Sequence, residues 1–306
     1  MTGAASKQTD STFEGIHTAL VTPFDARERI DEHVLAELIE DLLDNGIRGI
    51  AVNGSTGEFP ALTIDERKRC VEVACKAAGG RVPVTVQVGS MRTTETVDHA
   101  HHAAEQGAAC LLVVSPYYEA LGEEEVVAYY KAIAEVGLPV MIYNNPAATG
   151  WSMAPELVSR LADLEQVRYL KDTTGDARRL FRIQQLCGDR LEFLNGQDTL
   201  ALLGFLAGAR GTIWGAPNAT PKHCVTLWEL TVASPDLDRA RRLWDVFYPV
   251  NRFFEEEGYV AAVKSATTLR GIDVGAPRRP ILPLAPGRAQ ELRHLLEHLD
   301  EVATSL

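Results

Sequence analysis

The stretches PVMIYNNP, residues 139–146, and VRYLKDTTGD, residues 167–176, decide the fold of this 306-residue chain. Each begins as a short apolar run with β-branched residues and ends in polar residues. A segment whose apolar residues have helical spacing lies between them. This order is typical of parallel βα units, so further runs of the same kind should occur on both sides.

Eight such runs occur in the chain, about 20 to 35 residues apart, with helical patterns between them. Helix start signals precede some of these patterns, such as Thr63 followed by Glu66 and Thr93 followed by Thr96. The runs are IHTALV (16–21), GIAV (49–52), VPVTVQV (82–88), CLLVV (110–114), PVMIY (139–143), VRYL (167–170), LEFL (191–194) and GTIW (211–214).

Eight strands that alternate with helices predict an α/β fold, a (β/α)8 TIM barrel. The alternative is a doubly wound open sheet, which requires a glycine-rich dinucleotide turn after the first strand. The segment TALVTPFD, residues 18–25, has no such turn. The barrel is therefore the predicted architecture.

The domain organisation follows from where the eight runs begin and end. Residues 1–13 are mostly small and polar and should form a flexible tail, and residues 14–225 should form the barrel. Residues 226–306 should form a C-terminal helical extension packed on the barrel or on a neighbouring subunit. The helical pattern of residues 220–302 is longer than one barrel helix needs. A late loop is marked by Pro277, Pro280, Pro283 and Pro286.

The composition is that of a folded protein and excludes some classes of partner. Hydrophobic residues make up 46% and charged residues 24%. The formal net charge is −12, without a block of Lys and Arg, so most of the surface should repel nucleic acid. The N-terminus lacks the apolar core of a signal peptide, and no run approaches the roughly 20 apolar residues of a membrane span. We expect a cytoplasmic protein.

The five cysteines are scattered and form no CxxC pair, so the sequence predicts neither a disulfide framework nor a zinc site. We expect reduced, mostly buried thiols. The residues are Cys70, Cys75, Cys110, Cys187 and Cys224.

Barrel active sites are built at the C-terminal ends of the strands, so the residues that close each apolar run are the candidates for chemistry. Four of these ends carry residues suited to catalysis or binding. They are NGSTGE (53–58), SPYY (115–118), YNNP (143–146) and KDTTGD (171–176).

Lys171 directly follows the run VRYL, where a lysine must reach solvent, pair with an acid or act as a nucleophile. Asp172 does not decide between these roles, because adjacent strand residues point to opposite faces. An amine attacks a carbonyl only in its neutral form, which burial in an apolar barrel interior favours. The residues at the other strand ends therefore have to decide which role Lys171 has.

Two of those ends favour the nucleophile. The glycines of GSTGE, residues 54–58, allow a sharp turn that presents N–H groups to a carboxylate, although a plain βα turn is the alternative. A phosphate loop of the form GxxxxGK[ST] is absent. Tyr143 should point into the same mouth as Lys171, where a phenol transfers protons to and from a carbinolamine. Its alternative role is that of a core tyrosine.

Three histidines, His99, His101 and His102, lie in a helical pattern where only the i, i+3 pair shares a face. No cluster of carboxylates or histidines at a strand end supports them as ligands. We therefore predict a solvated helix face and no metal site.

Taken together, the strand ends resemble the dihydrodipicolinate synthase and N-acetylneuraminate lyase family of class I aldolases. The resemblance covers nearly the whole chain. It is carried by TALVTPF (18–24), NGSTGE (53–58), SPYY (115–118), YNNP (143–146) and LKDTTGD (170–176).

The resemblance implies roles for several catalytic residues. Lys171 would form the imine with a 2-keto acid, and Tyr143 would be the acid and base. Ser55 would link Tyr143 to Tyr118 in a proton relay, and Thr56 would help to bind the keto-acid carboxylate. In this family the second tyrosine of the PYY run reaches the neighbouring subunit's site, so Tyr118 would act across a dimer interface.

Further residues match positions that line the family's pocket. Gly196 and Ile213 match positions whose backbone lies near the nucleophile, and Asp198 matches a position that contacts sugar hydroxyls in sialic-acid lyases. The resemblance also implies a homo-oligomer, usually a tetramer built as a pair of dimers. It implies no metal and no organic cofactor.

Two departures leave the substrate open. Synthases of dihydrodipicolinate have an arginine two residues after the proline of YNxP, where this chain has Ala148. Sialic-acid lyases follow the pocket aspartate with a glutamate, where this chain has Thr199. We therefore expect an aldolase or dehydratase acting on a 2-keto acid such as a 2-keto-3-deoxy sugar acid, with pyruvate as product or co-substrate.

Three alternatives remain beside this expectation. One is 4-hydroxy-tetrahydrodipicolinate synthase, which Ala148 disfavours. A second is a catalytically silent sugar-acid binder or regulator on the same barrel, which the intact Lys171, Tyr143 and Ser55 disfavour. A metal-dependent aldolase is the third, and insensitivity to a chelator would exclude it.

Overall fold

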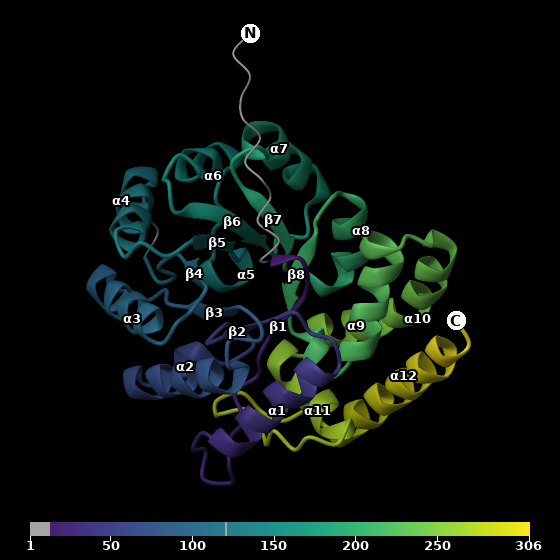
Figure 1. Cartoon of the computed structure of the whole chain (residues 1–306). Coiled ribbons are helices and arrows are strands. Elements are labelled where there is room, and N and C mark those ends of the chain that lie inside the picture. The colour runs from purple at the N-terminus through teal and green to yellow at the C-terminus, as the bar shows by residue number, and fades with distance from the viewer. Residues whose placement is uncertain (1–12, 120) are drawn as a thin grey trace.

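The computed structural model describes residues 13–119 and 121–306. Its centre is a closed barrel in which each strand pairs in parallel with the next and β8 pairs with β1 (Figure 1). This confirms the predicted (β/α)8 barrel. The strands are β1 (Gly15–Ala19), β2 (Gly49–Val52), β3 (Val84–Gln87), β4 (Cys110–Val114), β5 (Val140–Asn144), β6 (Val167–Asp172), β7 (Glu192–Asn195) and β8 (Gly211–Trp214).

Helices surround the strands and fill the connections between them (Figure 1). Those that follow β1 to β8 in turn are α1 (Glu32–Asp44), α2 (Ile64–Ala78), α3 (Thr93–Glu105), α4 (Glu123–Ala134), α5 (Pro146–Thr149) with α6 (Pro155–Leu161), α7 (Ala177–Cys187), α8 (Ala201–Leu206) and α9 (Pro221–Trp228). Short turns of other helix types are η2 (Phe59–Ala61), η3 (Asp198–Leu200), η4 (Ala216–Asn218) and η5 (Glu229–Ala233).

The two predicted helix starts differ in how they are capped. Thr63 caps α2 as expected, in a capping box with Glu66. Helix α3 begins at Thr93, so this helix start is also confirmed, although the cap residue is Arg92 and not Thr93. The hydroxyl of Thr96 donates to the backbone carbonyl of Arg92 at 3.2 Å and accepts from the backbone N–H of Ser90 at 3.0 Å, which links the start of α3 to the segment after β3.

Strand side chains alternate between two cores, because successive residues point to opposite faces. The outer core fills the space between the strands and the helices. The inner core lies inside the barrel and includes Tyr143 and Tyr169. Phe13, which we predicted to be part of the flexible tail, is buried in this inner core with its ring 4.5 Å from that of Tyr169. The rest of that predicted tail lies outside the described residues.

The C-terminal segment adds three helices beside the barrel. They are α10 (Leu237–Glu256), α11 (Tyr259–Leu269) and α12 (Pro286–Thr304). Helix α12 packs on α10 and α11 along the outside of the molecule, near α1 and α9 (Figure 1). The boundary that we predicted after residue 225 falls inside α9, so α9 runs from one predicted domain into the other.

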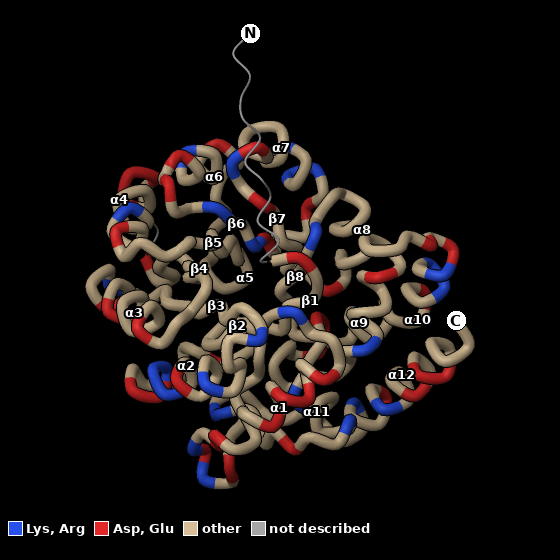
Figure 2. The backbone as a smooth tube through the Cα atoms, viewed as in Figure 1, with Lys and Arg blue, Asp and Glu red and all other residues tan. Residues whose placement is uncertain are grey.

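The distribution of charged residues and the state of the cysteines agree with what the sequence predicted. Acidic and basic residues are intermixed along the helices and loops (Figure 2). All five cysteines are described, and all are free; four are buried and Cys75 is partly buried. Within residues 13–119 and 121–306, no helix is both long and apolar enough to cross a membrane.

Candidate active site

Lys171 and Tyr143 lie side by side at the end of the barrel, because the register of β5 and β6 pairs these two residues directly. Both side chains point inward, and the Nζ atom of Lys171 lies 4.5 Å from the centre of the Tyr143 ring. Lys171 is only 5% exposed and Tyr143 4%. The sequence thus correctly predicted that both residues share one mouth.

Asp172 points away from this mouth, as alternation along a strand requires. Its carboxylate accepts hydrogen bonds from the Nδ2 atom of Asn144 at 2.9 Å and from the Nε atom of Arg179 at 3.0 Å. The acid next to the lysine in sequence is therefore occupied on the outer side of the barrel, and does not form an ion pair with Lys171.

Ser55 reaches Tyr143 from the end of β2. Its Oγ atom lies 3.4 Å from the phenol oxygen of Tyr143, either atom being the donor. Asn145 joins both: its Nδ2 atom donates to the phenol oxygen at 2.9 Å and to Ser55 at 3.4 Å. The sequence analysis missed Asn145, although the second asparagine of YNNP at a strand end was an available signal.

The loop that carries Ser55 and Thr56 is bounded by two residues in the left-handed region, Asn53 at φ 59° and Glu58 at φ 57°. This conformation is uncommon for residues other than glycine. At the first boundary, the Nδ2 atom of Asn53 donates to the backbone carbonyl of Arg67 at 2.8 Å. A side-chain contact with α2 therefore holds the start of the loop.

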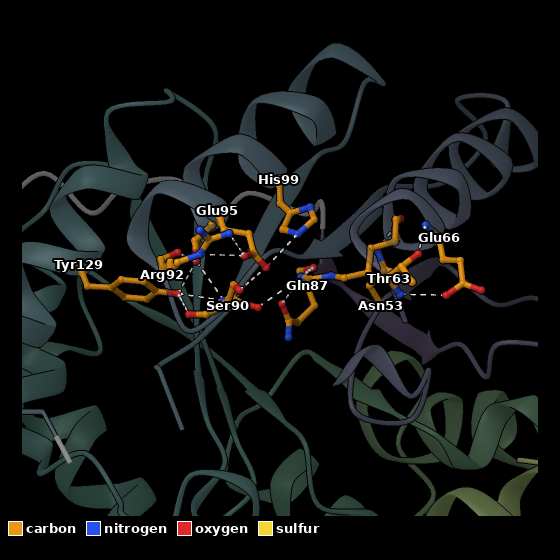
Figure 3. A network of polar contacts seen from close by, with 12 residues as sticks. Asn53, Thr63, Glu66, Gln87, Ser90, Arg92, Glu95, His99 and Tyr129 are labelled. Carbon is orange, nitrogen blue, oxygen red and sulfur yellow. Dashed lines mark hydrogen bonds and ion pairs between the residues drawn. The ribbon is translucent and has the colours of Figure 1, made fainter. Parts of the chain in front are cut away.

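Arg67 belongs to a polar network that continues to the end of β3 and the start of α3. Figure 3 shows Gln87, Ser90 and Glu95 of this network. Its guanidinium donates to the carbonyls of Gln87 and Gly89 at 3.1 and 3.3 Å. Burial lowers the pKa of Arg67 to about 10. The network continues through Ser90, whose hydroxyl donates to Glu95 at 2.6 Å. The network thus links α2, which holds the start of the loop after β2, to the end of β3 and the start of α3.

His99 is part of this network, which corrects the prediction of a solvated helix face (Figure 3). The side chain is 5% exposed and faces Glu95, with Nε2 3.9 Å from the carboxylate. Burial lowers its pKa to about 4. His101 is exposed, whereas His102 contacts the backbone carbonyl of Lys68 at 3.3 Å. The reason is that α3 packs its histidine-bearing side against α2.

A cavity of about 300 Å³ opens above Lys171. Ser55, Thr56, Tyr143 and Gly196 all line it, so the structure brings most of the predicted residues together. A Cβ atom on Gly196 would lie 2.8 Å from the Cε atom of Lys171, so only glycine allows this approach. The remaining lining residues are Asn145, Ala147, Thr173, Gln197, Asp198, Trp214, Gly215, Glu255, Tyr259 and Val260.

The far side of this cavity carries two carboxylates. Asp198 is 2% exposed, one of its oxygens accepts from the hydroxyl of Tyr259, and the other, Oδ1, has no hydrogen-bond partner. Burial raises the pKa of Asp198 to about 7. Glu255 accepts from the backbone N–H and the hydroxyl of Thr199, at 3.0 and 2.8 Å. Among the described lining residues, Lys171 is the sole cation.

Tyr259 and Glu255 come from the C-terminal helices, and the sequence analysis did not single them out. Tyr259 is the first residue of α11, and its hydroxyl accepts from the backbone N–H of Gly215 at 2.8 Å, after β8. Burial raises the pKa of Tyr259 well above its ordinary value. No spacing pattern in the sequence marks a glutamate or a tyrosine as part of a site. Only the packing of α10 and α11 on the barrel shows that Glu255 and Tyr259 line the cavity.

Comparison with known proteins places the chain in a family. The model of the dihydrodipicolinate synthetase family matches residues 12–299. The chain is 35% identical to the 4-hydroxy-tetrahydrodipicolinate synthase of Thermomicrobium roseum, over 95% of this chain and 96% of that protein. This chain belongs to the dihydrodipicolinate synthetase family. The family resemblance of its five motifs is thus confirmed, and with it membership of a family of lyases.

Solved structures of the family have the same fold. A dihydrodipicolinate synthetase-type protein of Pseudomonas aeruginosa is 36% identical, with a TM-score of 0.91 over 94% of this chain and 99% of its own. YagE, a prophage protein of Escherichia coli K12 whose crystal structure contains pyruvate, is 30% identical, with a TM-score of 0.89 over 94% and 99%.

Three further residues considered from the sequence lie outside the lining of the cavity. Tyr118 is 85% exposed, whereas its neighbour Tyr117 packs edge-on against Phe59 with ring centres 6.0 Å apart. Ile213 is fully buried inside the barrel, one residue before Trp214 of the lining. Ala148 is exposed on α5, next to the lining residue Ala147. Family membership does not test the roles of these three residues, which stay predictions.

The described residues do not gather into a group of three or more His, Cys, Asp or Glu side chains that could hold a metal ion. The polar side chains that line the cavity with Lys171 carry hydroxyls, two amides, an indole and carboxylates. Chelator sensitivity remains the test for a metal.

Proposed function

We propose that this chain is a lyase that forms a Schiff base between Lys171 and a 2-keto acid, with pyruvate as product or co-substrate. The observation that carries the proposal is the buried amine of Lys171, 4.5 Å from the Tyr143 ring in a cavity with no second cation among its described lining residues. The pyruvate in the crystal structure of YagE supports the choice of ligand.

The reaction follows from the groups around the lysine. Neutral Lys171 attacks the C2 carbonyl of the keto acid, and Tyr143 donates a proton so that the carbinolamine loses water. The protonated imine then accepts the electron pair of the C3–C4 bond as that bond breaks and the C4 hydroxyl, having lost its proton, becomes a carbonyl. In a dehydratase the imine instead accepts the electron pair of a C3–H bond when C3 loses its proton, and the resulting enamine expels hydroxide from C4. Thr56 and the backbone of its loop would hold the substrate carboxylate. Ser55 and Asn145 orient the phenol of Tyr143.

The far side of the cavity favours a substrate with an uncharged, hydroxylated chain. Asp198 and Glu255 would repel a second carboxylate, whereas the free oxygen of Asp198 can accept a hydrogen bond from a sugar hydroxyl. This supports a 2-keto-3-deoxy sugar acid.

A second candidate is 4-hydroxy-tetrahydrodipicolinate synthase, because several relatives at 33% to 35% identity have that name. Its aldehyde substrate, aspartate semialdehyde, carries a carboxylate, and the described lining of the cavity offers no cation besides Lys171 to bind it. Ala148 also stands where, by the family resemblance, synthases of dihydrodipicolinate have an arginine. This candidate is therefore disfavoured.

Turnover of a panel of substrates tests the proposal. The panel contains 2-keto-3-deoxy acids with neutral hydroxylated chains, and pyruvate with hydroxylated aldehydes or with aspartate semialdehyde. We expect turnover with the neutral chains that survives a chelator. Activity with aspartate semialdehyde alone would favour the synthase, and loss of activity with a chelator would favour a metal-dependent aldolase. Silence on the whole panel would favour a binding or regulatory protein.

A further inference from the structure

A buried ion pair lies beneath the loop that carries Ser55 and Thr56. Lys264 of α11 is 1% exposed, and its Nζ atom lies 2.8 Å from the carboxylate of Glu58, whose side chain is fully buried. The same ammonium donates to the backbone carbonyl of Ala276 at 3.1 Å and lies 4.2 Å from the centre of the Phe24 ring. The proposed reaction uses neither charged group.

Glu58 is the last residue of the loop and is held on both carboxylate oxygens. Lys264 neutralises one oxygen, and the other accepts from the backbone N–H of Arg278 at 2.8 Å. Because Glu58 has a left-handed φ of 57°, its conformation depends on such surrounding contacts. The C-terminal segment therefore fixes the end of a loop that lies more than 200 residues earlier in the chain.

The segment after β1 contributes further contacts at the same place. The hydroxyl of Thr22 donates to the carbonyl of Gly57 at 2.7 Å. Phe24, two residues later, lies between two cations, with Arg278 at 4.4 Å and Lys264 at 4.2 Å from its ring. The residues of the motif TALVTPF do not line the cavity. Its last residues instead contact the loop and the ion pair that holds the end of the loop.

Stability alone is a weak reason for such a pair. Moving two charges out of water is costly, and buried ion pairs replaced by apolar residues are often no less stable. Burial lowers the pKa of Lys264, against the opposite effect of Glu58. The pair does fix a position, because it joins the ammonium of Lys264 in α11 to the carboxylate of the residue that ends the loop.

We propose that Lys264 is a positioning residue that acts through Glu58 to place Thr56 and the backbone of its loop for keto-acid binding. This inference rests on the proposed function, because the loop is the part of the site that receives the carboxylate. Lys171 itself lies on β6 and does not contact the pair. Loss of Lys264 should therefore weaken binding of the keto acid more than it slows imine formation once the acid is bound.

The test uses borohydride trapping of pyruvate, measured over a range of pyruvate concentrations, in the wild type and in Lys264→Met. We expect the half-saturating concentration to rise about tenfold or more, the usual effect of losing a charge-assisted contact, with the trapping rate at saturation within about threefold of the wild type. The double variant Glu58→Gln with Lys264→Met removes both charges and provides a folded comparison if the single variant does not fold. It should show the same separation of the two quantities.

The control is Arg270→Gln, which removes an ion pair between the residue after α11 and Asp41 of α1 without touching the loop. It should trap pyruvate like the wild type. A folded Lys264→Met variant with an unchanged half-saturating concentration of pyruvate would overturn the inference. A trapping rate at saturation that falls in parallel with the folded fraction of the variant would also overturn it. Failure of the wild type to trap pyruvate at all would instead overturn the proposed function, and this inference with it.

Discussion

The two sides of the cavity differ in origin and in charge. The reactive side consists of Lys171, Tyr143 and Ser55, which stand at or just after the ends of β6, β5 and β2. The far side consists largely of Asp198 in η3, Glu255 in α10 and Tyr259 in α11. One side offers an amine and hydroxyls, the other carboxylates. Under the proposed function, the barrel would supply the groups that activate a keto acid, while the connections and added helices would select the rest of the substrate.

This division gives each side its own experiments. Substitutions on the reactive side should reduce turnover of every substrate by a similar factor. Substitutions on the far side should change the preference between substrates, or the stability of the protein, and leave imine formation with pyruvate intact.

The largest effect among the substitutions below is expected for Tyr143→Phe on the reactive side. Turnover should fall by about 10² or more, because a positioned acid and base is lost while the ring that packs on Lys171 remains. The measurement is steady-state turnover of the best substrate of the panel, with pyruvate binding as the control. Turnover within a factor of two of the wild type would remove Tyr143 from the mechanism.

A smaller effect is expected at Ala148, beside the cavity. Ala148→Arg should improve catalytic efficiency with aspartate semialdehyde by about tenfold or more, because a guanidinium can bind its carboxylate in a bidentate manner. Ala148→Leu adds bulk without charge and should not. Efficiency is measured in a coupled assay with dihydrodipicolinate reductase. A wild-type value of about 10⁴ M⁻¹s⁻¹ or above, in the normal enzyme range, would contradict this account of Ala148.

The exposed Tyr118 provides a test of whether the reactive side is complete within one chain. If Tyr118 acts across a dimer, mixing Lys171→Ala with Tyr118→Phe subunits should restore about a quarter of the wild-type activity after random exchange, since half of the dimers are mixed and each has one intact site. Exchange is verified by mass spectrometry. No recovery after verified exchange would argue against action in trans.

The last effect concerns Asp198 and is seen in stability, with the smallest effect expected on imine formation. Its pKa of about 7 lies above that of an unfolded aspartate, so the folded state keeps a proton that the unfolded state has released. The wild-type free energy of unfolding should therefore fall between about pH 4 and 7, relative to Asp198→Asn, by on the order of a few kcal/mol. Chemical denaturation at a series of pH values measures it, with the exposed Asp98→Asn as control. Parallel profiles for Asp198→Asn and the wild type would refute the shift.

The sequence predicted the barrel and the reactive side because both have local signatures. Apolar runs at regular spacing define the strands, and a residue that closes a run must lie at the mouth. Lys171 and Tyr143 could thus be placed together, although their pairing depends on the register of β5 and β6.

The far side and the loop support could not be predicted in this way. Glu255, Tyr259 and Lys264 lie in helices whose spacing shows only which face is apolar. Their side-chain partners, Thr199, Asp198 and Glu58, are 56 residues or more away along the chain, and nothing in the local pattern indicates which partner each residue meets. The same reason explains the wrong prediction for His99. The local sequence predicted a solvated helix face, whereas packing of α3 against α2 buries this side chain.

The most direct measurement of the central claim is the site of covalent labelling by pyruvate and borohydride. Reduction traps an imine, so the account predicts one pyruvate-derived adduct, mapped by peptide mass spectrometry to Lys171 and absent from Lys171→Ala. Lys264→Met should retain labelling at saturating pyruvate, because Lys264 forms no imine. Labelling that persists undiminished in Lys171→Ala, or an adduct that maps to another lysine, would contradict the account.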